Sequence, residues 1–230
     1  MAAAARLSRR LTPGDLDHTL EQITRAAVDC LPDVQQASIT FTHADGRLES
    51  VAPTHAVSTR LDDAQYELRE GPCYEAAVDQ VHVTAPDLAR DPRFPRYRGL
   101  AANEGVRAQA ALRLFDRAHS RAALNLYSST AGAFEDLASV GDLFAHQSAV
   151  AIDYAREIDN LQQAMQTRAA IGQAVGVVME RYGMSEERAF AFLTRLSQHR
   201  NLKLRDLVAE FLKTVQSPRT SASLVGNPES

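Results

Sequence analysis

The stretch Arg168-Ala-Ala-Ile-Gly-Gln-Ala-Val-Gly-Val-Val-Met-Glu-Arg-Tyr-Gly183 decides the fold of the C-terminal part of this chain. Its apolar residues recur at helical spacing, and Gly183 is a typical left-handed residue just past a helix end. Gly172 and Gly176 lie inside this predicted helix, where each glycine costs about 1 kcal/mol relative to alanine. We therefore expect another helix to approach closely at these two glycines, because the missing side chains leave room for it.

Two more amphipathic helices are predicted after Gly183. Ser185 is a typical N-cap residue, and Glu186 and Glu187 suit the positive end of a helix dipole. We expect the second helix to bury a broad stripe made of Ala189, Phe190, Phe192, Leu193 and Leu196. Asn201 is predicted to cap the third helix, in which apolar residues recur from Leu204 to Val215. Each helix is too short to be stable alone, so a three-helix bundle is predicted.

A long connecting helix is predicted upstream of this bundle. The helical pattern begins at Phe134, and neither proline nor glycine interrupts it between Gly141 and Gly172. Such a length exceeds the usual range of globular helices and favours a coiled coil or stalk. Because Ile158, Leu161 and Met165 carry the apolar pattern beyond the preceding domain, we expect a homodimer through this helix.

The N-terminal part mixes both kinds of element. Asp45-Gly46 is a strong hairpin signal between two short alternating runs. The predicted strands are Ala37–Phe41, Leu48–Ala52, Val81–Thr84, Val106–Leu114 and Ala122–Ser128, with a turn over Asp116–Ser120. The predicted helices are Leu16–Leu31, a short one after Glu70-Gly71-Pro72, and Tyr97–Asn103. This order predicts an α+β fold in which helices flank an antiparallel sheet.

Charge and composition exclude several function classes. The formal net charge is −4, but residues 161–216 carry +3, which leaves −7 for the remainder. This modest basic bias is a weak indicator of nucleic-acid binding, because exposed arginines are usually only solvated. Lysine occurs only as Lys203 and Lys213, so neither a P-loop nor a Schiff-base lysine is possible upstream. The start of the chain lacks the apolar core of a signal peptide, and no window approaches a membrane span. We expect a cytoplasmic protein.

Nothing in the sequence indicates catalysis or metal binding. Cys30 and Cys73 are too few for a disulfide framework, which favours reduced thiols. Cys73 follows Gly71-Pro72 near a predicted helix start, which can lower a thiol pKa and suits a redox sensor or chromophore anchor; an idle buried thiol is the favoured alternative. The histidines show no ligand pair, so no metal is expected, with haem ligation by His82 or His119 as a remote alternative. No catalytic triad or carboxylate pair is visible, so we expect no enzyme.

The C-terminal segment resembles the ANTAR family. The resemblance rests on Arg168–Gly183, then on Ala189-Phe190, Leu193, Leu196-Ser197 and Asn201–Arg205, over about 55 residues. It implies a three-helix module that binds tandem hairpins in nascent RNA and thereby prevents an overlapping terminator from forming. One departure is Val175, which stands where many members carry a lysine, so one phosphate contact is in doubt.

The resemblance also implies residue roles. It assigns core positions to Ile171, Ala174, Met179, Ala189, Phe190 and Leu193. It assigns the RNA-binding surface to Arg168, Gln173, Arg181, Arg195 and Asn201. Arginine suits this role because it can contact phosphate, stack on a base and hydrogen-bond to it. The alternatives are a solvated helix face for each arginine and a plain helix cap for Asn201.

The N-terminal segment, roughly residues 15–155, resembles GAF domains of the kind joined to ANTAR modules in actinobacteria. The resemblance rests on Glu70-Gly-Pro-Cys-Tyr-Glu-Ala-Ala77, on Ala123–Ser128 and on the α+β order. A phosphorylatable receiver domain is excluded, because its site needs a lysine that this region lacks. The resemblance implies a sensor that can hold a small molecule beside its sheet; the ligand residues and the cofactor remain unknown.

These observations predict a GAF–ANTAR protein of four parts. We expect a flexible N-terminus over residues 1–14, a GAF-like sensor over 15–155, an ANTAR RNA-binding domain with its connecting helix over 156–216, and a disordered tail over 217–230. The leading hypothesis is a signal-responsive, RNA-binding regulator of transcription antitermination. The alternatives are a protein-interaction adaptor and a DNA-binding helix-turn-helix regulator, although the Leu196–Leu204 connection is long for that motif.

Overall fold

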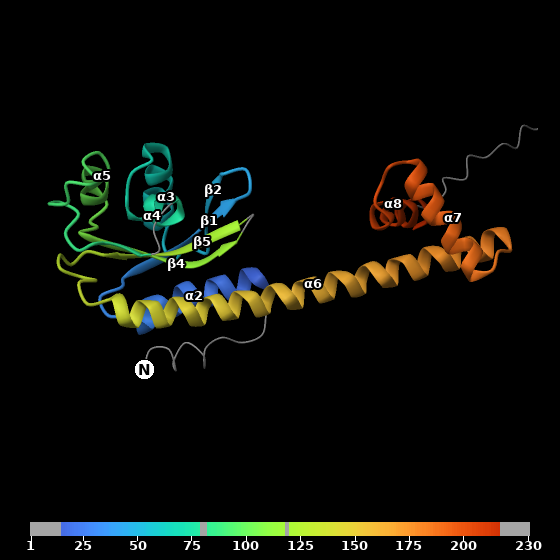
Figure 1. Cartoon of the computed structure of the whole chain (residues 1–230), viewed down its shortest axis with the longest axis horizontal. Coiled ribbons are helices and arrows are strands. Elements are labelled where there is room, and N and C mark those ends of the chain that lie inside the picture. The colour runs from blue at the N-terminus through green and yellow to red at the C-terminus, as the bar shows by residue number, and fades with distance from the viewer. Residues whose placement is uncertain (1–14, 79–81, 118–119, 217–230) are drawn as a thin grey trace, which may run out of the picture. The chain divides into compact units, whose positions relative to one another are not determined.

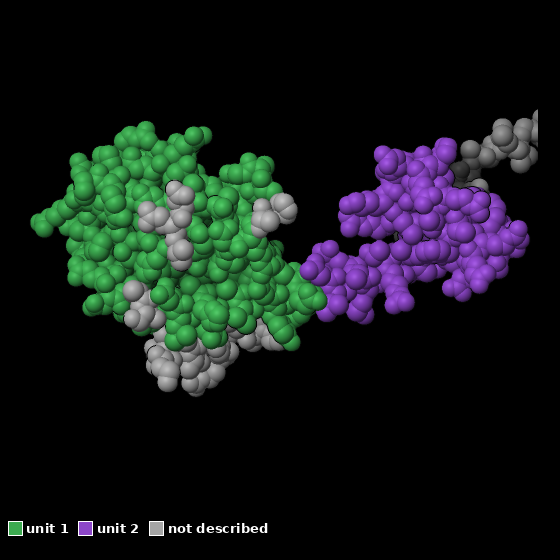
Figure 2. Space-filling view, in the orientation of Figure 1, with its two compact units in different colours: residues 1–159 green, residues 160–230 purple. Residues whose placement is uncertain are grey.

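The computed structural model describes residues 15–78, 82–117 and 120–216, so both predicted tails lie outside the described residues. The chain divides into two compact units, residues 1–159 and 160–230, which Figure 2 colours separately. The first unit contains strands and helices, whereas every described element of the second is helical. The predicted α+β class with a C-terminal three-helix bundle is therefore confirmed.

The first unit is built on an antiparallel sheet with the strand order β2-β1-β5-β4-β3. Its strands are β1 (Gln36–His43), β2 (Leu48–Val51), β3 (His82–Ala85), β4 (Ala108–Arg117) and β5 (Ser120–Ser128). The predicted strands are all present, and Gly46 has the positive φ of 82° that the predicted hairpin turn needs. Strands β4 and β5 pair as far as Arg117 and Ser120, so the turn is shorter than the predicted Asp116–Ser120.

Helices cover both faces of this sheet (Figure 1). Helix α2 (Leu16–Cys30) and the first part of α6 (Ala138–Tyr182) lie on one face, where an apolar core includes Ile23, Ile39, Leu124, Phe144 and Ile152. Helices α3 (Ala56–Leu68), α4 (Pro72–Val78) and α5 (Tyr97–Asn103) lie on the other face. The strand alternation therefore buries apolar residues under α2 and α6, and turns Ser38, Thr40 and Asn125 toward α3 and α4.

Helix α3 is not among the elements that the sequence predicted. Its buried face combines Val57 and Leu61 with Ser58, Asp62 and Gln65, so the apolar periodicity that marks an amphipathic helix is weak. The buried polar residues find partners on the sheet, which no local pattern records. Helix α6 likewise begins at Ala138, four residues later than predicted, and Phe134 has a positive φ of 75°.

The second unit contains residues 160–182 of α6, together with α7 (Glu186–His199) and α8 (Leu204–Gln216). Gly183 has φ 61° and Ser185 occupies the N-cap of α7, as predicted. The bundle core contains Ala174, Val175, Val178, Ala189, Leu193 and Val208. The predicted burial of Phe190 and Phe192 is wrong, because their exposed fractions are 46% and 40%. Smaller or shorter side chains, Ala189 and Leu193, fill the space between α7 and α6 instead.

Two local predictions in this unit are also wrong. Asn201 does not cap α8; it lies in the preceding loop with φ 51° and donates its backbone N–H to the carbonyl of Gln198 at 3.1 Å. No other described element covers Gly172 or Gly176, since a Cβ built on either meets nothing within 4 Å. The bundle packs against a different side of α6, around Ala174 and Val178.

Candidate functional site

The second unit presents an exposed aromatic pair between α6 and α7. The rings of Tyr182 and Phe192 have centroids 6.2 Å apart and planes inclined by 45°. They are 57% and 40% exposed, although aromatic side chains of this size normally help to form a core. Around them lies a hollow of about 700 Å³ whose lining includes Arg188, Arg195 and His199. We call these five residues the aromatic face.

Local sequence explains how this face forms. Helix α6 ends at Tyr182, because Gly183 takes the left-handed conformation that turns the chain into α7. Along α7, residues 188, 192, 195 and 199 follow one another at spacings of three and four, which puts them on one side of the helix. The turn therefore brings the last aromatic residue of α6 beside a basic and aromatic stripe of α7.

The electrostatics of this face favour an anionic partner. Within the described part of the chain, Arg188 and Arg195 form no ion pair, and neither do Arg168 and Arg181. Two other arginines of the unit are paired, Arg200 with Glu210 at 3.3 Å and Arg205 with Asp206 at 3.4 Å. Glu187 also lines the hollow and is the acidic residue of its lining. Exposed rings beside unpaired guanidinium groups can stack on bases and bind phosphate.

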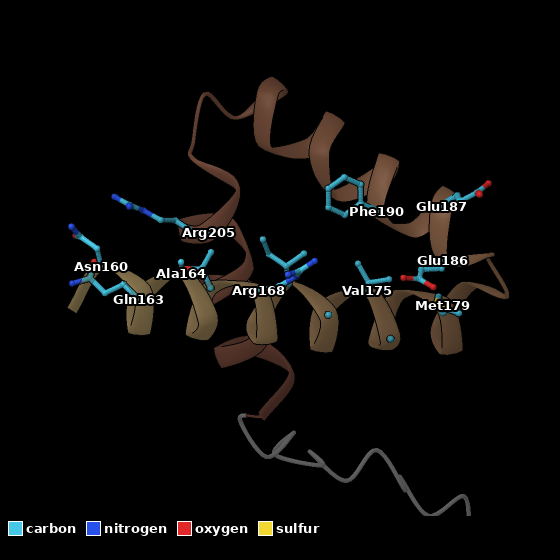
Figure 3. Close-up of a pocket in the computed structure, with 14 residues that line it drawn as sticks. Asn160, Gln163, Ala164, Arg168, Val175, Met179, Glu186, Glu187, Phe190 and Arg205 are labelled. Carbon is cyan, nitrogen blue, oxygen red and sulfur yellow. The ribbon is translucent and has the colours of Figure 1, made fainter. Parts of the chain in front are cut away.

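A second concave surface lies between α6, α7 and Arg205 of α8 (Figure 3). It has a volume of about 970 Å³, and its lining includes Arg168, Gly172, Gly176, Phe190 and Arg205. We call it the glycine groove after its two glycines. Glu186 and Glu187 belong to the same lining, so its positive and negative charges balance. The groove is therefore less suited than the aromatic face to a polyanion.

The structure separates the five residues that were predicted to bind RNA. Arg195 lies in the aromatic face, and Arg168 lies in the glycine groove. Gln173 and Arg181 are exposed on α6 outside both linings, and Asn201 is exposed in the loop before α8. Gln173 is five residues from Arg168, which puts it about 140° further around the helix. The five residues do not form one continuous surface, and their roles remain predictions.

The sequence interpretation missed Tyr182, Arg188, Phe192 and His199. A signal for them exists, because an aromatic residue directly before a C-cap glycine is followed by basic and aromatic residues at helical spacing. The periodicity of α7 hid this signal, since Phe190, Phe192 and Leu193 all fit a broad apolar stripe.

The first unit holds a buried polar cluster between the sheet and α3. The Asp62 carboxylate is fully buried and accepts hydrogen bonds from Ser38 Oγ at 2.7 Å, Ser50 Oγ at 2.6 Å, Asn125 Nδ2 at 3.2 Å and the Tyr127 hydroxyl. It forms no ion pair with any described residue. Burial therefore raises the pKa of Asp62, in spite of these hydrogen bonds.

Cys73 belongs to the same cluster and is not activated. Its thiol is fully buried, with Sγ 2.9 Å from Thr40 Oγ1 and 3.9 Å from the Tyr66 hydroxyl. Burial, followed by the nearby Asp62 carboxylate, raises the pKa of the Cys73 thiol well above its usual value. The suggestion that the start of the helix lowers this pKa is wrong, because desolvation dominates. The favoured alternative of a buried thiol is confirmed.

The motif around Cys73 has a structural role. Gly71 has φ 127°, and a Cβ there would lie 2.3 Å from Gln65 Oε1, so only glycine fits. Gln65 Oε1 in turn accepts the backbone N–H of Cys73 at 2.9 Å. Glu70 accepts the backbone N–H groups of Arg96 and Tyr97 at 2.7 and 2.9 Å, which fixes the start of α5. The Glu70–Cys73 turn thus fastens α3, α4 and α5 together.

The described residues contain no cluster of three or more His, Cys, Asp or Glu side chains suited to a metal ion. His82 on β3 is 3.6 Å from the Asp142 carboxylate, and His119 lies outside the described residues. None of the described helices combines the length and the apolar character that a membrane span needs.

Comparisons with protein families identify both units. The family model for the GAF domain matches residues 14–153, and the model for the ANTAR domain matches residues 159–212. Both are regulatory domain families. No curated protein sequence matches the chain.

Solved structures show the same fold at low sequence identity. The chain is similar to the N-acylhomoserine lactone dependent LuxR family transcription factor CepR2 from Burkholderia cenocepacia, with a TM-score of 0.53 and 14% identity over 68% of this chain and 97% of that chain. It is also similar to the GAF domain of a phosphoenolpyruvate-protein phosphotransferase from Coxiella burnetii, with a TM-score of 0.53 and 14% identity over 69% and 95% of the two chains. A third is free methionine-R-sulfoxide reductase from Neisseria meningitidis, with a TM-score of 0.50 and 12% identity over 68% and 87%.

Proposed function

Because the chain belongs to the GAF domain family and carries an ANTAR domain after its GAF domain, we propose that it is a signal-responsive, RNA-binding regulator of transcription antitermination. In this proposal the GAF domain is a cytoplasmic sensor that controls an ANTAR module, and the module binds tandem hairpins in nascent RNA. ANTAR domains are nucleic-acid-binding regulators, and GAF domains bind small ligands, which supports both halves of the proposal.

One observation carries the RNA assignment, namely the aromatic face. Single-stranded loop bases are recognised by stacking on aromatic rings and on guanidinium planes, with phosphates bound by arginine. Tyr182 and Phe192 supply exposed rings, and Arg188 and Arg195 supply guanidinium groups that form no ion pair with a described residue. Of the residues predicted from the sequence, Arg195 is therefore the one we expect to contribute most. Arg168, Gln173, Arg181 and Asn201 are proposed as further contacts with the RNA backbone.

We also propose that the protein is a homodimer held together through α6. Apolar side chains recur along this helix at spacings of four and seven residues, and Val150, Tyr154, Leu161 and Met165 are 53%, 71%, 56% and 72% exposed. A repeat of this kind is typical of a coiled coil, in which the apolar stripe of one helix packs against the same stripe of its partner. We call these four residues the seam of α6. Ile158, also predicted to face the partner, is half-buried. A dimer would present two ANTAR modules, which suits an RNA with two hairpins.

The decisive experiment is to titrate a tandem-hairpin RNA with the full-length protein at several salt concentrations. The comparisons are the same RNA with scrambled loops, Phe192→Leu in the aromatic face and Phe190→Leu in the glycine groove. The two phenylalanines are on the same helix with similar exposure, so they form a matched pair. Loss of one stacking contact costs about 1–3 kcal/mol, or roughly 5- to 150-fold in affinity. We expect this loss for Phe192→Leu, and little change for Phe190→Leu.

Other outcomes would redirect the proposal. Equal and weak binding of intact and scrambled RNA would overturn the RNA assignment and favour the protein-interaction adaptor. Tighter binding to duplex DNA than to the hairpin RNA would favour the DNA-binding regulator. Stronger weakening by Arg168→Ala and Phe190→Leu than by Arg195→Ala and Phe192→Leu would move the RNA site to the glycine groove.

A further inference from the structure

We propose that a hollow on the first unit binds a small organic anion with a planar ring; this inference rests on the sensor role proposed above and names its ligand class. The hollow has a volume of about 420 Å³, which is within the range of small-molecule sites. Five elements or their connections contribute to its lining, which consists of Thr42, Gly46, Leu48, Tyr66, Arg69, Tyr74, Ala77, Val78 and Arg121.

We call this site the sensor hollow, and the charges of its lining favour an anion. Its lining contains two arginines and no carboxylate. Arg69 forms no ion pair with any described residue, so its charge is available to a ligand. Arg121 is held in place by its own contacts, since Nε donates to Asp116 Oδ1 at 2.7 Å and an Nη atom donates to the Val78 carbonyl at 2.8 Å. We therefore assign the main anion contact to Arg69, and a secondary contact to Arg121, whose charge Asp116 partly neutralises.

The backbone at Arg69 supports this assignment. Arg69 ends α3 in the left-handed conformation, with φ 52° and ψ 42°. A residue with a Cβ pays about 1–2 kcal/mol to adopt it, so glycine or asparagine is the usual choice at such a position. This backbone conformation fixes the direction in which the Arg69 side chain leaves the end of α3, where it lines the hollow.

The remaining lining selects a planar, largely apolar body. Tyr66 and Tyr74 supply two rings, and Leu48, Ala77 and Val78 supply aliphatic surface. Flat ligand rings pack against such surfaces by stacking or edge contacts. Thr42 adds a polar contact, because its buried Oγ1 has no hydrogen-bond partner among the described residues. A buried hydroxyl without a partner is costly, and a ligand heteroatom would supply one.

The sensor hollow is joined to the buried polar cluster through Tyr66. The hydroxyl of Tyr66 is 2.8 Å from Thr40 Oγ1, which accepts from Asn125 Nδ2 at 2.8 Å. Asn125 also donates to Asp62. A ligand that moves the Tyr66 ring would therefore disturb hydrogen bonds to β5, the central strand of the sheet, and to its neighbour β1.

The test is calorimetric titration of the full-length protein, at constant ionic strength, with two planar anions of different size, salicylate and guanosine 5′-monophosphate. The neutral analogues salicylamide and guanosine test the charge, and inorganic phosphate tests the ring. We expect saturable binding of at least one planar anion, at least tenfold tighter than its neutral analogue or phosphate. Arg69→Gln should weaken that binding at least tenfold, whereas Arg98→Gln, at an exposed position outside the hollow, should leave it unchanged.

Absence of saturable binding by both anions would overturn the proposal, as would equal affinity for Arg69→Gln and wild type. Equal binding of the neutral analogues would also overturn it, because the arginines would then have no part in selection. Tyr66→Phe keeps the ring that packs against the ligand and removes the hydroxyl that hydrogen-bonds to Thr40. We expect this variant to retain binding. None of these readouts uses RNA, so failure here leaves the RNA proposal standing, and failure of the RNA experiment leaves this one standing.

Discussion

At the scale of single residues, Asp62 is a buried carboxyl group whose desolvation is costly. It is a fully buried carboxylate without a described counter-ion, held by donors from three strands. Because burial raises its pKa above the unfolded value, protonated Asp62 favours the folded state. That stabilisation is complete below the ordinary carboxyl pKa, near 4, and is lost as the pH rises through the raised pKa.

Asp62→Asn should therefore flatten the dependence of stability on pH. We expect the free energy of unfolding of wild type, relative to the variant, to fall as the pH rises from about 4 through the raised pKa. Urea unfolding at a series of pH values, followed by circular dichroism, measures this difference. Asp63→Asn, at the exposed neighbouring position, is the matched control. Parallel pH profiles for wild type and Asp62→Asn would show that the carboxylate does not govern the profile.

Arg195 allows a second prediction at this scale. If its guanidinium neutralises one RNA phosphate, Arg195→Gln should weaken binding to hairpins of different loop sequence to a similar degree. It should also lower the slope of log K against log salt concentration by about 1. Phe192→Leu should instead weaken binding without changing the salt slope. Filter binding at four salt concentrations separates the two effects, and an unchanged slope for Arg195→Gln would argue against a phosphate contact.

At the scale of elements, α6 contains two glycines, Gly172 and Gly176, that lower its helix stability. No close contact in the described chain explains why glycine is needed there. A Cβ at Gly172 or Gly176 meets no atom within 4 Å, so alanine fits at both positions. Each substitution should stabilise the helix by about 1 kcal/mol and raise the melting temperature. Gly183→Ala is the contrasting control, because φ 61° there makes alanine unfavourable by about 1 kcal/mol or more. A lower melting temperature for Gly172→Ala or Gly176→Ala would contradict this account.

The exposed seam of α6 gives a prediction about assembly. Leu161→Glu and Met165→Glu place charges where the proposed coiled coil buries apolar side chains. We expect the double variant to be monomeric by light scattering at concentrations where wild type is dimeric. Gln162→Glu, also exposed but off the seam, should remain dimeric. If wild type is already a monomer at high concentration, α6 is not a dimer interface.

At the scale of the whole molecule, the proposed function requires the sensor and the RNA module to be coupled. A ligand can shift RNA binding only if it has different affinities for the states that bind RNA well and poorly. Linkage then requires reciprocity: the factor by which a planar anion changes RNA affinity must equal the factor by which RNA changes anion affinity. Titrations in both directions measure the two factors. A factor of 1 in both, with each ligand bound, would show that the units act independently.

Much of the architecture could be predicted from the sequence, because it depends on local periodicity. The strands, α2, α5 and the long α6 follow from apolar spacing and turn residues, and the spacing of the Arg168–Gly183 motif is enough to identify the ANTAR domain. Helix α3 could not be predicted in this way, since its buried face is half polar. The candidate RNA surface was predicted only in part, because Arg195 was included whereas Phe192 was expected in the core and Tyr182 was given no role.

By itself, then, the sequence determined the order of the elements other than α3, the two regulatory domains and the absence of any lysine before Lys203. Tertiary structure alone decided that Phe190 and Phe192 are exposed and that no other described element covers Gly172 and Gly176. It also decided that Asp62 of α3 and Cys73 of α4 are buried together against the sheet. The physical reason is the range of the interactions. Periodicity reports which residues share a face of one element, but burial depends on which other element covers that face, and the side chains of distant segments settle that.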